Sequence, residues 1–266
     1  MPVQLDLKSR VWVTAIGVCV GLAIATPSPG APETAARKPS VQTPAKKIDP
    51  NAVKALRDMS AYLQTLSTFR LESQTSLDVV TNDGQKIQFD GVAHYKVRKP
   101  DAFVIDIVSD SWNRQYLYNG KEFTLYAPKL GFYSTVPAPA TIQATIADIG
   151  TRFGISVPLD DLFRWSGADG TRADALTSAF LVGTDTIDGV KTNHYAFRED
   201  KIDWQIWIQQ GDQPLPRKLV IVDRRDAADP AYVARLTWTL NSPLTDEDFA
   251  FRPGNDAKRI RITLQQ

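Results

Sequence analysis

Two histidines, His94 and His194, are the side chains of this chain that could exchange protons near neutral pH at ordinary pKa values. Acid–base catalysis or metal binding would also need carboxylates or further ligands at suitable spacing, and neither histidine has them. His94 is in phase with Asp90 and Lys96, which places it on the wet face of a strand, and His194 alternates with Tyr195. We therefore interpret both histidines as structural residues.

Two groups of aspartates could be considered for chemistry. Asp160 and Asp161 are adjacent, so their side chains would diverge on a helix, and capping explains them better than an acid–base pair. Asp223, Asp226 and Asp229 have a spacing that suggests calcium, but two arginines interrupt them and no glycine or closing glutamate follows. We interpret this segment as a charged loop and expect no metal site.

Motifs that would indicate an enzyme are missing from the sequence. It contains no Gly-x-Ser-x-Gly nucleophile turn, no phosphate-binding glycine loop and no Gly-x-Gly-x-x-Gly dinucleotide motif. We therefore expect a protein that is not an enzyme and needs no cofactor.

The first 25 residues have the layout of an export signal. Two basic residues precede an apolar run from residue 11 to 25, which is shorter than the about 20 residues that span a bilayer. Residues 23–25 (Ala-Ile-Ala) fit the small-x-small cleavage rule. We expect removal of residues 1–25, with an uncleaved anchor as one alternative and acylation at Cys19 as another, although Val18 stands where lipoprotein signals have a small residue.

Charge and composition limit the partners of the chain. The 31 basic and 30 acidic residues give a net charge of +1, so we expect no nucleic-acid partner held by a positive field. Cleavage after Ala25 would remove Lys8, Arg10 and Asp6, leaving 29 residues of each sign, and would also remove the only cysteine. Residues 26–48 hold five prolines among small and polar residues, which predicts a disordered linker before a domain over residues 49–266.

Residues 203–223 show most clearly what kind of structure the domain contains. Two β-rich runs flank a Gly/Pro cluster over residues 211–216, which predicts an antiparallel hairpin. Trp204, Ile206 and Ile208 share one face through the period of two, while Gln205 and Trp207 share the other. Comparable alternation recurs over residues 69–136, 180–198, 232–240 and 260–264, so we expect about eleven strands.

Two helical segments accompany the strands. Asp49-Pro50 is suited to start a helix over residues 49–67, because aspartate caps free amides and proline is tolerated in the first turn. A second apolar stripe ends at Gly154, and a shorter helix is expected after Pro158, so helical structure is predicted over residues 141–163. The apolar positions at spacings of three and four are Val53, Leu56, Met59, Leu63 and Leu66 in the first segment, and Ile142, Ile146, Ile149, Phe153, Leu159, Leu162 and Phe163 in the second.

The order of the elements predicts the fold. No helix long enough for a parallel crossover separates successive strands, so the sheet should be antiparallel. A sheet of this size must curl or split, and the helices are placed to cover its concave face. We expect a mainly β, α+β fold: a curved antiparallel half-barrel of about eleven strands with helices against its open side.

Five short phrases in this order connect the chain with a known superfamily. They are VRKPDAF (residues 97–103), YNGKEF (118–123), DWQIWI (203–208), LPRK (215–218) and DFAFRP (248–253). Over about residues 49–264 the chain resembles the periplasmic lipoprotein-carrier superfamily, which includes the chaperone LolA and the receptor LolB, and more closely a branch of predicted periplasmic proteins. This resemblance implies a periplasmic location and an internal apolar cavity that receives acyl chains.

Apolar side chains on the inward phase of the strands are the main candidates for a binding site. A curved single-layer sheet with few helices has little side-chain mass to fill its interior, so these residues could line a cavity, and a packed core is the alternative. The candidates for the wall are Phe89, Tyr95, Phe103, Ile105, Tyr116, Tyr118, Phe123, Trp204, Ile206, Leu236 and Trp238, and the candidates for a helical lid are Leu56, Leu63, Ile142, Ile146 and Phe153.

Two functions of different classes are compatible with these residues and with the resemblance. The first is an exported envelope protein that carries a lipid, a lipoprotein acyl chain or another apolar ligand and makes transient contact with a membrane. The second is a non-enzymatic envelope module with a filled core that binds another protein through its sheet edge or outer face.

Overall fold

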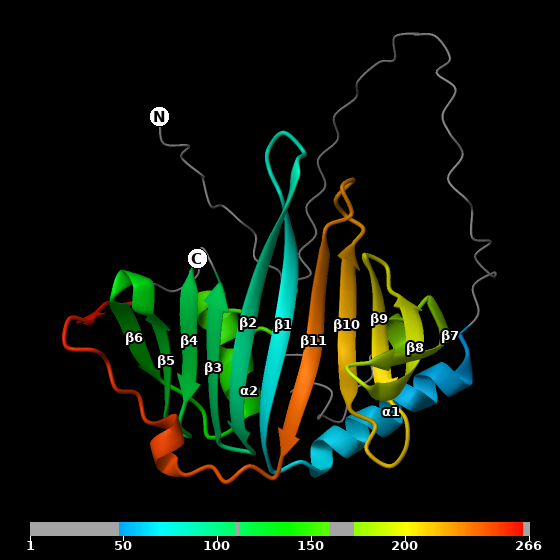
Figure 1. The fold of residues 1–266 in the computed structure, drawn as a ribbon. Helices are drawn as coiled ribbons and strands as arrows, with labels where there is room; N and C mark the ends of the chain where they lie inside the picture. The colour runs from blue at the N-terminus through cyan, green and yellow to red at the C-terminus, as the bar shows by residue number, and fades with distance from the viewer. Residues whose placement is uncertain (1–47, 110–111, 160–172, 263–266) are drawn as a thin grey trace. The chain divides into compact units, whose positions relative to one another are not determined.

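The computed structural model describes residues 48–109, 112–159 and 173–262, all within one compact unit that spans residues 46–266 (Figure 1). Its elements are α1 (Pro50–Thr65), β1 (Thr68–Val80), β2 (Lys86–Arg98), β3 (Ala102–Ser109), β4 (Asn113–Tyr118), β5 (Glu122–Ala127), η1 (Pro128–Leu130), β6 (Phe132–Pro137), α2 (Ile142–Phe153), η2 (Ala173–Ala175), β7 (Ser178–Ile187), β8 (Val190–Arg198), β9 (Ile202–Gln209), β10 (Pro216–Asp223), β11 (Ala231–Leu240), η3 (Asp246–Phe249) and β12 (Lys258–Arg259). None of the described helices is long and apolar enough to cross a membrane.

The strands form one open, curved sheet of twelve in the order β12-β6-β5-β4-β3-β2-β1-β11-β10-β9-β8-β7. All neighbours are antiparallel except β12, which runs parallel to β6. The long strand β1 lies at the centre and joins two meanders by pairing with β2 on one side and β11 on the other. The predicted curved antiparallel sheet is therefore confirmed. The edge strand expected over residues 260–264 is wrong in position: β12 lies at residues 258–259, residues 260–262 are outside any strand, and residues 263 and 264 are not described.

The helices begin where the sequence places their caps. The Asp49 carboxylate accepts the backbone N–H of Asn51 at 2.9 Å, and the Thr141 hydroxyl accepts that of Ala144 at 3.2 Å. α2 ends at Gly154, whose φ of 64° is left-handed. The helical structure predicted over residues 141–163 is therefore interrupted at residues 154–159, where Leu159 lies in a turn. Residues 160–163, with Leu162 and Phe163, lie outside the described residues, so the shorter helix expected there stays a prediction.

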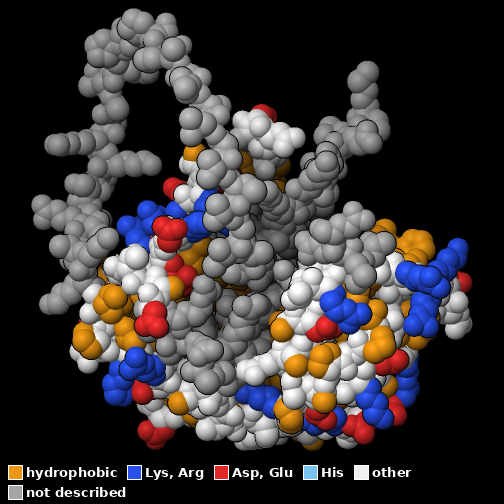
Figure 2. Space-filling model, turned by 180° about the vertical axis from the view of Figure 1, so that it is seen from behind, with side chains coloured by type: hydrophobic (Ala, Val, Ile, Leu, Met, Phe, Trp, Pro, Cys, Tyr) orange, Lys and Arg blue, Asp and Glu red, His pale blue; other side chains and the backbone are white. Residues whose placement is uncertain are grey.

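Both helices lie on the concave side of the sheet, which is the far side in Figure 1 and faces the viewer in Figure 2. The apolar stripe of α1 and that of α2 are buried in one hydrophobic core together with the inward residues of the strands. The two helices therefore cover the concave face, as the sequence predicts.

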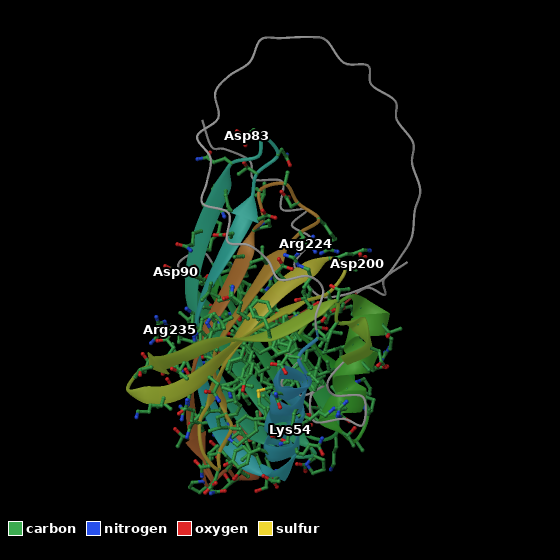
Figure 3. All side chains as sticks on the ribbon, turned by 90° about the vertical axis from the view of Figure 1, so that its right-hand side faces the viewer. Lys54, Asp83, Asp90, Asp200, Arg224 and Arg235 are labelled. Atoms are coloured by element: carbon green, nitrogen blue, oxygen red, sulfur yellow. The ribbon has the colours of Figure 1, made fainter. Side chains whose placement is uncertain are left out.

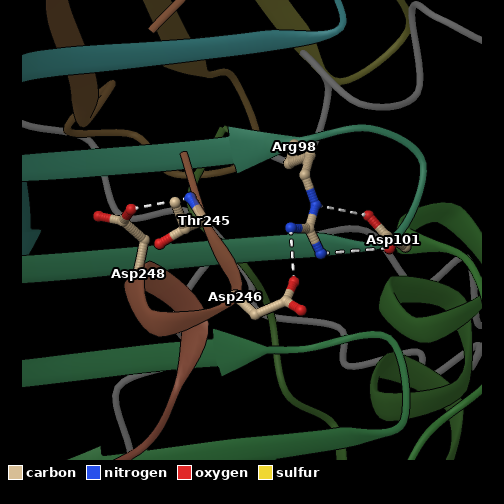
Figure 4. Close-up of polar contacts among 5 residues, drawn as sticks. All are labelled: Arg98, Asp101, Thr245, Asp246 and Asp248. Atoms are coloured by element: carbon tan, nitrogen blue, oxygen red, sulfur yellow. Dashed lines mark hydrogen bonds and ion pairs between the residues drawn. The ribbon is translucent and has the colours of Figure 1, made fainter. Parts of the chain in front are cut away.

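The convex face carries a strap made by the chain after β11. Phe249 of η3 is buried there, with the Arg98 guanidinium 5.0 Å from its ring centre. Arg98 also donates to Asp246 at 2.7 Å and to Asp101 at 3.1 Å (Figure 4). After this clamp the strap continues to β12, so it joins the middle of the sheet to its β6 edge.

Candidate functional site

The sequence-predicted wall residues lie on six strands of the concave face, and most of them are buried. Tyr95, Phe103, Ile105, Tyr116, Tyr118, Phe123, Trp204, Ile206 and Leu236 belong to the buried core, whereas Phe89 and Trp238 are half-buried. Of the lid candidates, Leu56, Leu63, Ile142 and Ile146 are buried in the same core and Phe153 is half-buried. Figure 3 shows the side chains of the sheet and of α1 directed toward one another.

Around α2, an aromatic group is formed by residues from β3, β4 and β5. Phe103 lies between Tyr118 and Phe123, with ring-centre distances of 5.6 and 6.5 Å, and Tyr116 lies 6.4 Å from Phe123. These distances and tilted rings are typical of aromatic pairs that attract each other. The wall residues of this half therefore contact one another directly.

A second aromatic group lies on β8 and β9, beneath α1. Phe197 stacks on Trp204 with ring centres 4.2 Å apart, and Tyr195 lies 6.4 Å from Phe197. At the centre of the sheet, Phe69 packs against Trp238 at 5.2 Å. Phe69, Tyr195 and Phe197 were not among the predicted wall residues, although the alternation of their strands would have placed them on the same face.

Three phenols of this face lie in an apolar environment. Tyr95 interacts electrostatically with Tyr116 and Tyr232, and burial raises the pKa of all three hydroxyls above the ordinary value of 10.0. The Tyr95 hydroxyl donates to the Pro158 carbonyl over a long 3.4 Å, and the buried Ser73 hydroxyl lies beside Tyr232. These groups stay neutral at physiological pH and supply a few polar atoms within an otherwise apolar face.

The turn between β2 and β3 holds both helices. The Lys99 ammonium group donates to the Leu63 carbonyl in the last turn of α1, and the Pro100 carbonyl accepts the N–H of Ile142 at the start of α2. Burial lowers the pKa of Lys99, whose charge faces the negative end of the α1 dipole. At its other end, α1 is tied to β7, because Asp49 N–H donates to the Ala179 carbonyl at 2.8 Å.

A second contact fixes the start of α2. The Tyr118 hydroxyl and the Thr145 hydroxyl both donate to the Pro139 carbonyl, at 2.5 and 3.1 Å. The Tyr118 side chain therefore serves the attachment of the helix as well as the aromatic group.

The two histidines lie on the convex face, away from the aromatic groups. His94 is exposed and its Nδ1 lies 3.8 Å from Glu72. His194 stacks on Trp207 with ring centres 3.8 Å apart, and Nε2 lies 2.9 Å from the Gln205 amide oxygen, while burial lowers its pKa. Both positions agree with the structural interpretation.

The described residues contain no group of three or more His, Cys, Asp or Glu that could hold a metal ion. In the loop that the sequence predicts to be merely charged, Asp223 accepts from Arg225, and Asp226 accepts from the backbone N–H of Ala228. These contacts are those of a charged, self-bonded turn. Asp160 and Asp161 lie outside the described residues.

Residues 52–263 match the model of a family described as "Predicted periplasmic protein", DUF2092. The chain belongs to this family. The predicted relation to a branch of periplasmic proteins is thus confirmed, and the match spans all described residues except 48–51. No curated protein matches the sequence.

Solved structures that resemble this DUF2092 protein share low sequence identity with it. The lipoprotein LppX from Mycobacterium tuberculosis is 14% identical, covers 74% of this chain and 98% of its own, and has a TM-score of 0.48. LprF from Mycobacterium bovis is 12% identical, with coverages of 79% and 99% and a TM-score of 0.43. A LolA superfamily protein from Nitrosomonas europaea is 10% identical, with coverages of 75% and 97% and a TM-score of 0.36.

Proposed function

We propose that this protein is a periplasmic, non-enzymatic carrier that holds a lipid, a lipoprotein acyl chain or another apolar ligand between the concave face of its sheet and the helices α1 and α2. The observation that supports the proposal best is the wide inward face, on which aromatic rings from eight strands lie beneath two helices of the described part of the chain. Apolar surface removed from water would supply the affinity, at about 25 cal/mol per Å².

The three phenols give this face the composition of a ligand site. Small-molecule sites are mostly apolar and aromatic, with a few polar groups that fix the orientation of the ligand. Tyr95, Tyr116 and Tyr232 are neutral hydroxyls on that face, because burial keeps their pKa values high, and Tyr95 would have to exchange its long contact with Pro158 for a ligand. An ester or amide carbonyl at the head of an acyl chain is the chemical group they would recognise.

Uptake and release would require a helix to move. α1 and α2 cover the aromatic groups, so a ligand cannot reach them while both helices are in place. Each helix is held by hydrogen bonds at its ends and by its buried apolar stripe. Neither attachment belongs to the strand ladder, so one helix could be displaced without disruption of the ladder.

The first test is organic extraction of the protein, purified without detergent from a periplasmic fraction, followed by lipid mass spectrometry against a mock purification. A stoichiometric acyl-containing species is the expected result. An extract without such a species, also after unfolding, would count against the carrier function.

Tryptophan fluorescence provides a second test with a control on the same strand. Trp204 faces the core, while Trp207, three residues later, lies on the convex face beneath His194 and Lys218. A brominated fatty acid bound on the concave face should quench wild-type fluorescence. The quenched fraction should fall in Trp204→Phe and stay unchanged or rise in Trp207→Phe. Equal quenching of both variants would place the fatty acid elsewhere.

A second candidate function is supported by the direct ring contacts within both aromatic groups. The rings of Phe103, Tyr118 and Phe123 pack directly against one another, as the side chains of a filled core do. In that case the protein is an envelope interaction module that binds a protein partner by its outer surface. A clean extract together with capture of a defined partner after cross-linking in the periplasm would favour this function over the carrier.

A further inference from the structure

The edge of the sheet formed by β6 and β12 exposes three large apolar side chains. Leu130 is 68% exposed, Phe132 is 40% exposed and Ile260 is 48% exposed. They come from two segments that are far apart in the sequence, residues 128–133 and 254–262. We call these two segments together the basic apolar edge.

Backbone hydrogen bonds hold the two segments together. Lys258 N–H donates to the Gly131 carbonyl at 2.7 Å, and Ile260 N–H donates to the Tyr133 carbonyl at 2.8 Å. Lys258 pairs with Phe132 in parallel register, so Phe132, Lys258 and Ile260 share a face at the rim of the concave side. Gly131, with φ of 68°, turns the chain between Leu130 and Phe132. The exposed apolar residues are therefore part of a fixed surface.

The charge on this edge has one dominant sign. Lys129, Lys258, Arg259 and Arg261 lie on the two segments, and Asp256 is the only acidic residue there, which leaves a local charge of +3. Among the described residues, no carboxylate forms an ion pair with Lys258, Arg259 or Arg261. Seen from behind, this side of the molecule presents basic side chains next to hydrophobic ones (Figure 2). Such a surface attracts an anionic partner with an apolar interior.

The opposite edge of the sheet also exposes apolar residues, but it lacks the positive charge that an anionic partner requires. On β7, Leu181 and Val182 are 48% and 50% exposed, but the charged residues of that strand and its turn are Asp185 and Asp188. An anionic surface would be repelled there. Apolar exposure and positive charge coincide at the basic apolar edge and not on β7.

We propose that the basic apolar edge docks the protein on an anionic membrane surface. Leu130, Phe132 and Ile260 enter the headgroup region, while the basic side chains contact lipid phosphates. A second copy of the chain is a poorer occupant, because two such edges would bring like charges together. The proposal does not depend on a ligand in the core, since docking uses only the outer edge.

The test is flotation of the exported protein, purified without detergent, with phosphatidylcholine vesicles that do or do not contain phosphatidylglycerol. We expect binding only to the vesicles with phosphatidylglycerol, and weaker binding at high salt. The triple variant Lys258→Gln, Arg259→Gln, Arg261→Gln should bind on the order of 100-fold more weakly, from the contribution of each basic residue near an anionic surface.

Matched control variants distinguish binding by this edge from the effects of total charge and of exposed apolar residues elsewhere. The triple variant Lys121→Gln, Lys191→Gln, Lys201→Gln removes the same charge from exposed positions elsewhere and should bind like wild type. The double variant Leu130→Glu, Ile260→Glu should lose binding, whereas Leu181→Glu, Val182→Glu should keep it. Circular dichroism and thermal unfolding of each variant verify that it is folded.

Three results would overturn the proposal. They are equal flotation of the wild type with both kinds of vesicle, an equal loss in the two triple variants, and wild-type flotation of the folded double variant Leu130→Glu, Ile260→Glu. A fourth result would also overturn it: the wild-type protein forms a dimer, the double variant does not, and neither binds vesicles. The edge would then be a binding site for a second copy of the chain.

Discussion

Asp248 is the residue whose contribution to stability can be worked out most fully from the structure. Its carboxylate lies 2.9 Å from the Lys96 ammonium group and 3.6 Å from Arg70, and it accepts the Thr245 backbone N–H at 3.0 Å (Figure 4 shows the last contact). The hydrogen bond from Lys96, followed by that from Thr245, lowers the pKa of Asp248 from 3.8 to about 2. The ionised form of this carboxyl is therefore more stable in the folded state than in the unfolded state.

This pKa sets both the size and the pH dependence of the effect. A fall from 3.8 to about 2 corresponds to at most about 2.5 kcal/mol of stability at pH 7, and solvent screening on the outer face reduces this to about 1 kcal/mol. Because the folded pKa is the lower one, the contribution is complete above the unfolded value and is lost as the pH falls toward 2. At pH 3 about half of it should remain.

The perturbation is Asp248→Asn, which keeps a side-chain oxygen for the Thr245 N–H but removes the charge. Urea unfolding followed by tryptophan fluorescence should show the variant about 1 kcal/mol less stable than wild type at pH 7, and about half that at pH 3. The control is Asp246→Asn: its carboxylate pairs with Arg98 but is 92% exposed, so the loss should be within about 0.5 kcal/mol. A loss in Asp248→Asn that is the same at both pH values would refute the electrostatic explanation.

Three further predictions concern the core, the histidine stack and the attachment of α1. Phe123→Ala removes a fully buried ring that contacts Phe103, so the free energy of unfolding in urea should fall by about 3–5 kcal/mol, and a loss below about 1 kcal/mol would mean that the ring borders empty space. The pKa of His194 is lowered mainly by burial, so stability should decrease as the pH falls through 6.5, and His194→Gln should remove that part of the pH dependence; an NMR titration midpoint for His194 above 6.5 would contradict this. Lys99→Met leaves the Leu63 carbonyl without its donor and removes a cation from the C-terminal end of α1, so urea unfolding should show a loss of about 1–2 kcal/mol, and an unchanged stability would show that water replaces the amine.

The strands could be predicted because each carries its own period-two pattern. Trp204, Ile206 and Ile208 share one phase of β9 and are all buried in the core, as that phase requires. Trp207 shows the limit of this pattern. Its phase correctly predicts that it lies on the convex face, but not that it is almost fully buried there. Its cover consists of His194 from β8 and Lys218 from β10, and the pattern of one strand contains no information about its neighbours.

The strap on the convex face could not be placed from the sequence. The capped turn at residues 245–249 is predictable from its local residues, and the capping contact between Thr245 and Asp248 is present. Its location depends on Lys96 and Arg98, which lie about 150 residues earlier and bind Asp248 and Asp246. Contacts of that separation leave no local periodicity, and the same holds for the pairing of β12 with β6.

The composition of the candidate site was predictable, but its internal contacts were not. Alternation selected Tyr95 and Tyr116, which lie two strands apart with Ile105 between them. Tyr232 was recognised as a strand residue, but it approaches Tyr95 only because β11 pairs with β1. That pairing joins the last long strand to the first, and no local pattern in the sequence specifies it.

The β2–β3 turn is a point of the fold at which both helices and the strap are attached to the sheet. The side chain of Lys99 binds the end of α1, the carbonyl of Pro100 binds the start of α2, and Arg98 on the convex face binds η3. Each helix has a second attachment, α1 through Asp49 to β7 and α2 through the contact of Tyr118 with Pro139. A displacement of either helix therefore breaks contacts at this turn or at its second attachment, while the strand ladder stays intact.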